Sequence, residues 1–186
     1  MTKCVDQDFP CQNPDYDAFD QRARAELAKP ISASELVNKS LFCTEVPVNE
    51  DLLIGDIDHK LYLKGLQGQT GLYHLWIDYD DCDDHGTYTE LCVYVGKGLA
   101  DIRIANHIKT KWPKSAQLYI TFTSMENRLS KYYEQLFLDL YAFELKKNEN
   151  PGTKYLYGIW DQERHHMGTQ LNEVSSLSKI QSLDDL

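Results

Sequence analysis

The residues of this sequence best suited to chemistry gather at a glycine-bracketed turn, residues 94–98, which reads Tyr-Val-Gly-Lys-Gly. A helix is predicted directly after the turn. It would carry Arg103 and His107 four positions apart, and therefore on one face. A guanidinium forks onto the oxygens of a phosphate, and backbone amides in a glycine-rich turn bind the same kind of anion. The spacing therefore predicts a site for an oxyanion.

The charge distribution points to the same turn. The chain has a net charge of −10, which by itself disfavours nucleic acid as a partner. Residues 97–114 nevertheless carry a local charge of +4, whereas residues 78–84 contain five aspartates. The charged residues of the basic stretch are Lys97, Arg103, Lys109, Lys111 and Lys114, with Asp101 as the one acid. Such a patch in an acidic chain predicts a focused anion site rather than a general polybasic surface.

Three further polar residues would complete a site for phosphodiester hydrolysis. Such a site needs an activated water, groups that stabilise charge on the phosphoryl oxygens and usually a divalent ion. Tyr73 and Tyr94 lie on predicted strands, and Glu134 lies in an otherwise apolar helix pattern. Glu134 is either a salt-bridged or partly exposed carboxylate or a metal ligand, because an unpaired buried charge is unfavourable. A tyrosine, with an ordinary pKa of about 10, needs a cation nearby to act as a base, and Lys97 is the candidate.

Hydrophobic patterning predicts the elements that must position these residues. The predicted strands cover residues 71–77, 91–95 and 118–123. The helix that follows Ser124 is predicted over about residues 125–147, with that serine as its N-cap. In the second strand, Cys92 and Tyr94 are expected on one face, and the opposite face is expected to hold Leu91, Val93 and Val95. Residues 78–89 are expected to form a charged, turn-rich loop between the first two strands.

The helix at residues 100–112 has a clear amphipathic pattern. Its buried side is expected to hold Ile102, Ile104, Ala105, Ile108 and Trp112. Its open side is expected to hold Arg103, Asn106, His107, Thr110 and Lys111. This arrangement would present the arginine and the histidine together to a bound anion.

The chain divides into three predicted parts: an extension at 1–67, a domain at 68–160 and a tail at 161–186. The extension is predicted to be mainly helical. One helix begins near Asn13 and reaches about Ala28, and a second follows the capping-box residue Ser32 and ends near Phe42. Short strands or turns are expected at residues 52–54 and 61–63, and an extended segment is expected at residues 154–160. The extension is expected to dock on the domain or bind a partner.

The five cysteines are expected to be reduced, because their number is odd, no C-x-x-C pair is present and no signal peptide is recognisable. We therefore expect a cytoplasmic protein, with a nuclear or exported one as alternatives, and no membrane contact. Cys82 and His85 with the aspartates between them are half of a metal site or a solvated acidic loop. The loop is favoured, because zinc needs four well-spaced ligands. The pair His165-His166 is expected at the surface.

Residues 71–73 (Gly-Leu-Tyr), the turn at 94–97 (Tyr-Val-Gly-Lys), Arg103 and Glu134 together resemble the GIY-YIG nuclease family, over about residues 70–152. The continuation Tyr-Val-Gly-Lys-Gly with an arginine and a histidine is most similar to the branch that includes the LEM-domain, ankyrin-repeat endonucleases. The resemblance implies an α+β fold, in which a small three-stranded antiparallel sheet is flanked by helices.

The resemblance also implies a site that cleaves DNA with one Mg²⁺ or Mn²⁺ ion on Glu134. Tyr73 would be the base or water-orienting group and Tyr94 its hydrogen-bonding partner, while Arg103 would bind the phosphate. Lys97 and His107 would assist proton transfer. Lys109, Lys111 and the closing Asn150 are expected, with Lys97, to contact the substrate.

Two alternatives to a DNA endonuclease stay open. The net charge and the acidic segment at residues 78–84 oppose DNA affinity, which favours a catalytically inactive module that binds a protein. The acidic extension could contact such a protein partner. The second alternative keeps the enzyme and makes the substrate RNA. Nothing in the sequence distinguishes the two nucleic acids.

Overall fold

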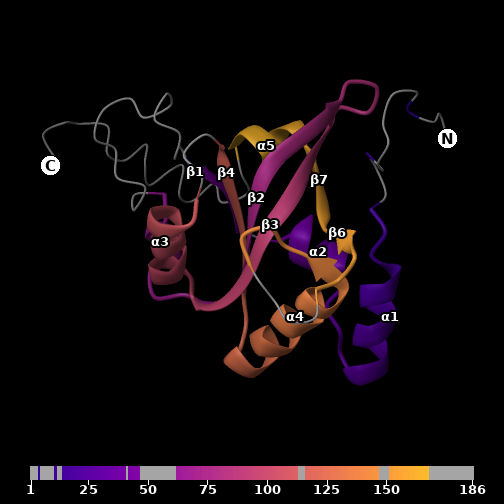
Figure 1. The fold of residues 1–186 in the computed structure, drawn as a ribbon, viewed down its shortest axis with the longest axis vertical. Helices are drawn as coiled ribbons and strands as arrows, with labels where there is room; N and C mark the ends of the chain where they lie inside the picture. The colour runs from indigo at the N-terminus through magenta and orange to yellow at the C-terminus, as the bar shows by residue number, and fades with distance from the viewer. Residues whose placement is uncertain are drawn as a thin grey trace, which may run out of the picture.

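In a computed structural model, an antiparallel five-stranded sheet organises the chain (Figure 1). The structure describes Cys4, Cys11 and residues 14–40, 42–46, 62–112, 116–146 and 151–167. The strand order is β1-β4-β2-β3-β7. Its members are β1 (Phe42–Val46), β2 (Thr70–Cys82), β3 (Thr87–Leu99), β4 (Leu118–Ser124) and β7 (Tyr157–Asp161). The fold is therefore α+β, as expected.

The sheet is larger than the three strands expected from the sequence. The three expected strands are present as β4, β2 and β3, and β2 pairs with both of the others. The N-terminal strand β1 adds to the free edge of β4, and β7 adds to the free edge of β3. These additions arise because an exposed strand edge offers unpaired amides and carbonyls, which distant short segments of the same chain can satisfy.

The segment expected to be an acidic loop is mostly strand. β2 continues to Cys82 and β3 begins at Thr87, so only residues 83–86 form the turn. Within the ladder Asp78 lies opposite Glu90. Gly86 has a φ of 59°, a left-handed value that glycine adopts readily. The long hairpin projects beyond the rest of the sheet, away from α3 and α4 (Figure 1).

A β-bulge in β3 changes the expected faces of this strand. The pairing shifts between Leu75 and Trp76, so that Leu75 pairs with Tyr94 and Trp76 with Cys92, which leaves Val93 as the extra residue. Tyr94 therefore shares a hydrophobic core with Val93, and Val95 moves to the opposite core. The strict alternation predicted from the sequence is wrong here, because a bulge inserts one residue and reverses every face after it.

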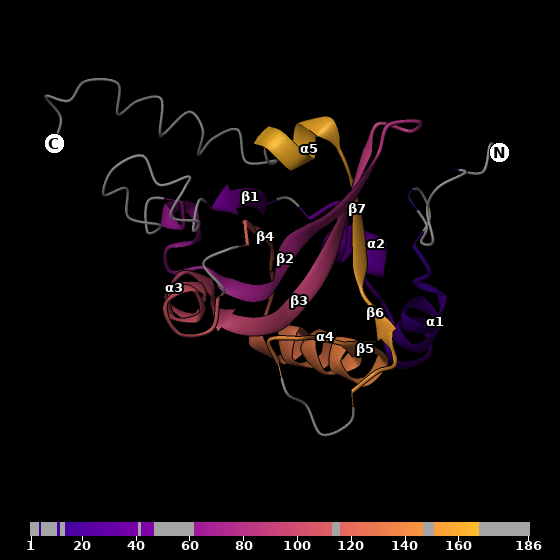
Figure 2. The same cartoon turned by 45° about the horizontal axis from the view of Figure 1, so that its top comes forward.

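The helices cover the two faces of the sheet. α1 (Asp17–Glu26), α2 (Ala33–Val37) and α4 (Asn127–Leu140) contribute to the core that contains Trp76 and Val95. α3 (Ala100–Thr110) contributes Ala100 and Ile104 to the other core. Figure 2 shows α3 apart from α4 and α1, with the central strands between them. α5 (Gln162–Met167) packs near β1 and β7.

Two predicted helix boundaries in the N-terminal part require correction. α1 begins at Asp17 rather than near Asn13 and ends at Glu26. The capping box at Ser32 is confirmed, since its side chain accepts from the Glu35 amide and Glu35 returns the bond. The helix it opens ends at Val37, and Phe42 already belongs to β1.

The long helix expected over residues 125–147 is shorter. Ser124 is the last residue of β4 and does not cap the helix, whose N-cap is Glu126. The helix ends at Leu140 because the chain becomes extended at Tyr141. The extended residues form β5 (Tyr141–Ala142), which pairs in parallel with β6 (Lys154–Tyr155). The extended segment expected at residues 154–160 is present as β6 and β7.

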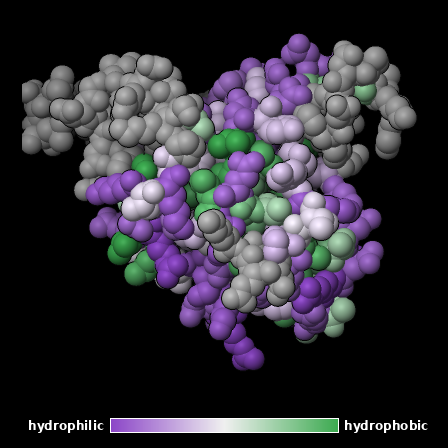
Figure 3. All heavy atoms as spheres, viewed as in Figure 1, coloured by the Kyte–Doolittle hydropathy of each residue, from purple (hydrophilic) through white to green (hydrophobic). Residues whose placement is uncertain are grey.

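Residues 62–63 form a turn that leads into the 3₁₀ helix η2 (Lys64–Leu66), so the strand or turn expected at 61–63 is a turn where the structure describes it. The expected segment at 52–54 lies outside the described residues. Among the described residues, no helix is both long enough and apolar enough to cross a membrane. The face drawn in Figure 3 is largely hydrophilic, with apolar residues gathered near its middle.

Candidate active site

The two tyrosines predicted to act in catalysis lie side by side on the face of the sheet that α3 covers. Tyr73 of β2 is opposite Gly96 of β3, and its neighbour Leu75 is opposite Tyr94. The β3 bulge is what places Tyr94 on the same face as Tyr73. Their ring centroids are 6.1 Å apart, with the ring planes inclined by 15°. Gly96 is required between them, because an added Cβ would lie 2.8 Å from Tyr94 Cε1 and would overlap the Tyr73 hydroxyl.

His107 joins this pair from α3. Its Nε2 lies 3.2 Å from the Tyr73 hydroxyl, and its ring centroid is 4.3 Å from that of Tyr94. The expectation that His107 lies on the open side of the helix is wrong. The side chain is 8% exposed, and it continues the buried stripe of Ala100 and Ile104. Ile102, which was expected to be buried, is 63% exposed instead.

The His107 imidazole is neutral at physiological pH. Burial and, to a smaller extent, the charges of Lys111, Arg103 and Lys146 together lower its pKa to about 4. A neutral imidazole has one acceptor nitrogen. If the Tyr73 hydroxyl donates to Nε2, the proton of the ring is on Nδ1, a buried atom with no hydrogen-bond partner among the described residues. In that arrangement Tyr73 is the donor and His107 is the acceptor.

Tyr73 is a neutral phenol in this structure. Burial raises its pKa above the ordinary value, and the charges of Tyr94 and Glu134 raise it further, whereas Arg103 lowers it. Burial also raises the pKa of Tyr94. The sequence suggested Lys97 as the cation that would lower a phenol pKa, but its Nζ donates to Asn127 Oδ1 at 3.2 Å. Arg103 is the cation that acts on both phenols.

Arg103 projects from the exposed side of α3 over the glycine turn. Gly98 has a φ of 108°, and a Cβ added there would lie 3.1 Å from Arg103 Nε. A side chain at position 98 would therefore be both strained and in contact with the guanidinium. This is the physical reason for the second glycine of the turn. It lets the start of α3 bring Arg103 close to the tyrosines.

Glu134 is the carboxylate of the site, and it has a partner that the sequence did not reveal. Its Oε1 accepts a hydrogen bond of 2.7 Å from Lys146 Nζ, and the two side chains are 18% and 20% exposed. Lys146 Nζ also donates to the Val95 carbonyl at 3.1 Å and lies 5.2 Å from the Tyr94 ring centroid. Glu134 is therefore salt-bridged, which is one of the alternatives that the sequence left open. Because the bond leaves a second carboxylate oxygen, it does not exclude the role of metal ligand.

Of the remaining predicted substrate contacts, Lys111 lies beside the tyrosines. It is the C-cap of α3, and its Nζ lies 5.3 Å from the Tyr94 ring centroid. Lys109 is exposed on α3. Asn150 lies outside the described residues. The structure thus brings together five of the six residues predicted to do the chemistry, whereas the sixth, Lys97, bonds to Asn127. The members are Tyr73, Tyr94, Arg103, His107 and Glu134, joined by Lys111 and Lys146.

His165, one of the two adjacent histidines near the C-terminus, forms a buried contact with Glu90 that is separate from the tyrosine site. His165 was expected at the surface but is 5% exposed, and its Nδ1 lies 2.8 Å from Glu90 Oε1. Burial raises the pKa of Glu90 to about 7, although the hydrogen bond to His165 opposes the shift. Only His166 is exposed, as expected. This pair lies on β3 and α5 and contributes no residue to the tyrosine site.

Comparison of the chain with protein-family models, curated proteins and solved structures gave no match. The geometry of its own residues therefore carries the functional argument.

Proposed function

We propose that this chain is a GIY-YIG-type endonuclease that hydrolyses phosphodiester bonds in DNA with the help of one divalent ion. The observation that carries the proposal is the hydrogen-bonding contact between the Tyr73 hydroxyl and His107 Nε2, beside the ring of Tyr94. Arg103 and Glu134 act electrostatically on the same phenol. The order of elements from β2 to α4 is the strand–strand–helix–strand–helix order of the family that the sequence resembles.

A proton relay from water through Tyr73 to His107 fits these environments. Because burial raises the phenol pKa, no standing phenolate activates the water. Instead, Tyr73 would accept a proton from the attacking water as its own proton passes to Nε2 of the neutral imidazole. Burial and, after it, the nearby cations lower the pKa of His107 and make it a weak base in the free protein. A bound phosphate would offset those charges, so the base would strengthen when substrate is present.

The cations around the tyrosines would hold the phosphate. Arg103 is exposed and able to present two parallel donors to phosphoryl oxygens. Lys109 on the exposed side of α3 and Lys111 at its C-cap extend the positive charge. A neighbouring phosphate of the bound DNA would lie there. Lys97 is bonded to Asn127 at the other side of the glycine turn. This placement favours a long anionic polymer over a single small phosphate.

The donor set at Glu134 fits a hard cation that keeps most of its water. A single carboxylate with one oxygen bonded to Lys146 can offer its second oxygen, and Mg²⁺ is often held by one or two carboxylates together with waters. Such an ion would stabilise charge on the leaving oxygen. Lys146 already holds a positive charge beside Glu134. It would move aside or share the carboxylate when the ion binds.

Two features favour a second candidate, an inactive module that keeps this fold. Tyr73 is completely buried, so water cannot reach its hydroxyl without a movement of the groups that cover it. The ammonium of Lys146 also occupies one oxygen of Glu134. In an active enzyme, movement of the long side chains of Arg103 and Lys146 on substrate binding would open the phenol. In an inactive module they would stay in place.

A cleavage assay with matched variants separates the candidates. Wild type and Glu134→Gln are incubated with duplex, branched and single-stranded DNA and with structured RNA, over a range of Mg²⁺ and Mn²⁺ concentrations. The amide keeps an acceptor for Lys146 but loses the charge that holds a cation. Asp139→Asn is the control, because it makes the same change elsewhere on α4, where the carboxylate pairs with Arg22.

The proposal expects metal-dependent cleavage of DNA by wild type and Asp139→Asn, and loss of cleavage in Glu134→Gln. Equal cleavage by wild type and Glu134→Gln would show that Glu134 is not the ligand of a catalytic metal ion. Absence of cleavage in every protein would favour the inactive module. Cleavage confined to RNA would correct the substrate and keep the mechanism.

A further inference from the structure

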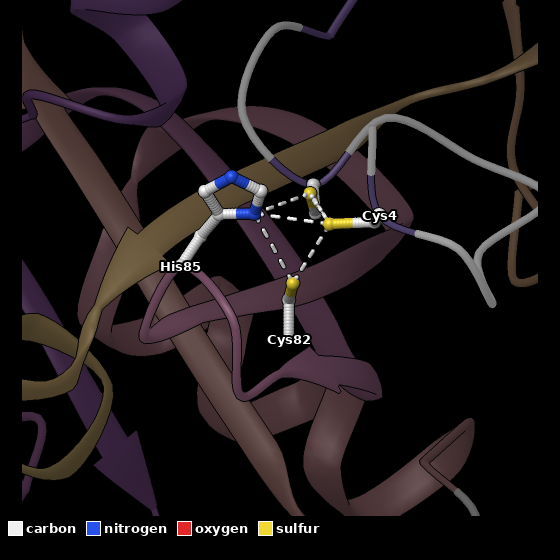
Figure 4. Close-up of side chains that lie close together, drawn as sticks. Cys4, Cys82 and His85 are labelled. Atoms are coloured by element: carbon white, nitrogen blue, oxygen red, sulfur yellow. Dashed lines mark hydrogen bonds between the residues drawn. The ribbon is translucent and has the colours of Figure 1, made fainter. Parts of the chain in front are cut away.

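Three thiols and one imidazole converge at the outer end of the β2–β3 hairpin. Cys82 and His85 belong to this end, and Cys4 and Cys11 reach it from far away in the sequence, with 78 positions between Cys4 and Cys82. Cys4 Sγ lies 3.0 Å from Cys11 Sγ, 3.1 Å from Cys82 Sγ and 3.0 Å from His85 Nδ1. Figure 4 shows the side chains of Cys4, Cys82 and His85 pointing toward one another.

The remaining distances close the group into a compact cage. His85 Nδ1 lies 3.4 Å from the sulfur of Cys11 and 3.4 Å from that of Cys82. All four donor atoms lie within 4.8 Å of one another. Cys11 and Cys82 are buried, at 7% and 6% exposed. None of the five cysteines, all of which the structure describes, forms a disulfide.

We propose that Cys4, Cys11, Cys82 and His85 form a tetrahedral zinc site with a structural role. Three cysteines and one histidine are a common ligand set of structural zinc, which takes four ligands and no open position. Around zinc, with bonds to sulfur of about 2.3 Å, neighbouring sulfurs of a regular tetrahedron lie about 3.8 Å apart. The observed contacts of 3.0 to 3.4 Å need to widen by less than about 1 Å to admit the ion.

Disulfide chemistry is a poorer account of the same group. Three sulfurs cannot all pair with one another, and the imidazole nitrogen in contact with each of them would have no part in a disulfide. Thiolates with an imidazole instead select a borderline or soft metal over Mg²⁺ or Ca²⁺. Zinc is the choice among these, because the described residues supply four donors and no fifth, which matches the closed tetrahedral site of structural zinc.

The surrounding structure shows what the ion would hold together. The backbone carbonyl of Cys11 accepts a hydrogen bond of 2.8 Å from Thr87 Oγ1, the first residue of β3. The His85 amide donates to the Cys82 carbonyl, which shapes the turn that aims both ligands to one side. The site would thus fasten the start of the chain to a hairpin that projects beyond the sheet.

This site is independent of the proposed catalytic centre. Cys82 lies nine positions along β2 from Tyr73, a separation of about 30 Å in an extended strand. The two sites also differ in chemistry, because Glu134 offers a hard oxygen and the cysteines offer soft sulfur. The zinc inference therefore holds or fails whether or not the chain cleaves DNA.

Metal analysis of the full chain tests the inference. The protein is purified without chelator and under reducing conditions, and its zinc content is measured by mass spectrometry. We expect one zinc ion per chain, and replacement by Co²⁺ should give the visible bands of a tetrahedral site with thiolate-to-cobalt charge transfer. These two measurements need no variant, so they do not depend on whether a substituted protein folds.

Variants then assign the ligands. Cys82→Ser should weaken zinc binding at least about a hundredfold, since loss of outer-shell partners alone costs about 10- to 100-fold. His85→Cys should retain zinc and shift the cobalt spectrum toward a four-sulfur site. The controls are Cys43→Ala, a buried cysteine outside the group, and Glu134→Gln, and both should keep one zinc per chain.

Three results would overturn the inference. One is a reduced wild-type chain that contains no zinc and takes up neither Zn²⁺ nor Co²⁺ with a thiolate signal. The second is a Cys82→Ser protein that binds zinc as tightly as wild type, which would place the ion elsewhere. The third is a disulfide between Cys4 and Cys11 in the metal-free protein whose reduction does not allow the chain to bind added zinc.

Discussion

Gly96→Ala tests whether the close packing of the two tyrosines positions the proposed base. The glycine lies between the rings with an ordinary backbone conformation, so the substitution acts through space and not through backbone strain. The new Cβ would lie 2.8 Å from Tyr94 Cε1, where ordinary contacts begin at 3.4 Å, and it would overlap the Tyr73 hydroxyl. At least one ring must therefore move.

The size of the expected effect follows from these distances. The Tyr73 ring has to retreat by roughly 1 Å, and a misplacement of that size costs about 100-fold in rate. The contact of 3.2 Å to His107 would exceed a hydrogen-bonding distance after an outward shift of only a few tenths of an ångström. Overpacking should also lower the free energy of unfolding by about 1–3 kcal/mol.

The assay compares the cleavage rate and the thermal midpoint of Gly96→Ala with those of Gly68→Ala. Gly68 has a φ of 72° with no atom near the added Cβ, so alanine there costs about 1–2 kcal/mol through strain alone. We expect both variants to melt a few degrees earlier and only Gly96→Ala to lose cleavage. If the Gly96→Ala protein cleaves DNA at the wild-type rate, the geometric account of Tyr73 and His107 is refuted.

Three further predictions address charge and capping. The folded-state pKa of His107 is about 4, which is lower than the unfolded value of about 6.5. The neutral imidazole of His107 therefore stabilises the fold above pH 6.5. This contribution falls by up to about 3 kcal/mol as the pH drops toward 4. Urea melts of wild type should show this slope, and melts of His107→Gln should show less of it. Lys146→Met should let cleavage saturate at a roughly tenfold lower Mg²⁺ concentration, since an ammonium about 4 Å from a dication repels it by on the order of 2 kcal/mol even in water; an unchanged Mg²⁺ dependence would count against an ion at Glu134. Ser32→Ala should lower the free energy of unfolding by about 1 kcal/mol, because it removes the capping box. The thermal midpoint should fall by about 2–4 °C. Ser40→Ala is the comparison, since it removes a hydrogen bond to Arg164 and leaves the capping box intact.

The sequence was sufficient for the order of elements around the site, because that order depends on local hydrophobic periodicity. The helix α3, the strand β4 and the capping box at Ser32 were predicted closely, and the central strands β2 and β3 were predicted in place but too short. The predicted residues that gather at the site were singled out by their chemical type and by the resemblance to the GIY-YIG pattern, because periodicity places an element but assigns no role to a side chain.

The failures share a physical cause, which is dependence on partners distant in sequence. The β3 bulge at Val93 is set by how the strand pairs with β2, so alternation alone could not place Tyr94. The burial of His107 follows from how α3 packs on the sheet, and no periodicity of charge reveals it. Lys146 reaches Glu134 only because α4 ends at Leu140 and the chain turns back.

The cysteine cluster shows the same limit. Cys82 and His85 alone gave half of a ligand set, and the acidic residues between them favoured a solvated loop. The other half, Cys4 and Cys11, lies near the N-terminus, and nothing in its spacing pointed to the hairpin. The only further signal in the sequence was that cysteines such as Cys4 and Cys11 had no assigned role.

In the mechanism that we propose, the Tyr73 hydroxyl activates water for phosphodiester cleavage. The most direct test is the rate at which wild type, Tyr73→Phe and the exposed-tyrosine control Tyr155→Phe nick supercoiled plasmid DNA in excess Mg²⁺. We predict that Tyr73→Phe is about 100- to 10,000-fold slower than the other two. Its thermal midpoint should stay within the few degrees that one lost buried hydrogen bond costs. Nicking by Tyr73→Phe at the rate of wild type would contradict the claim.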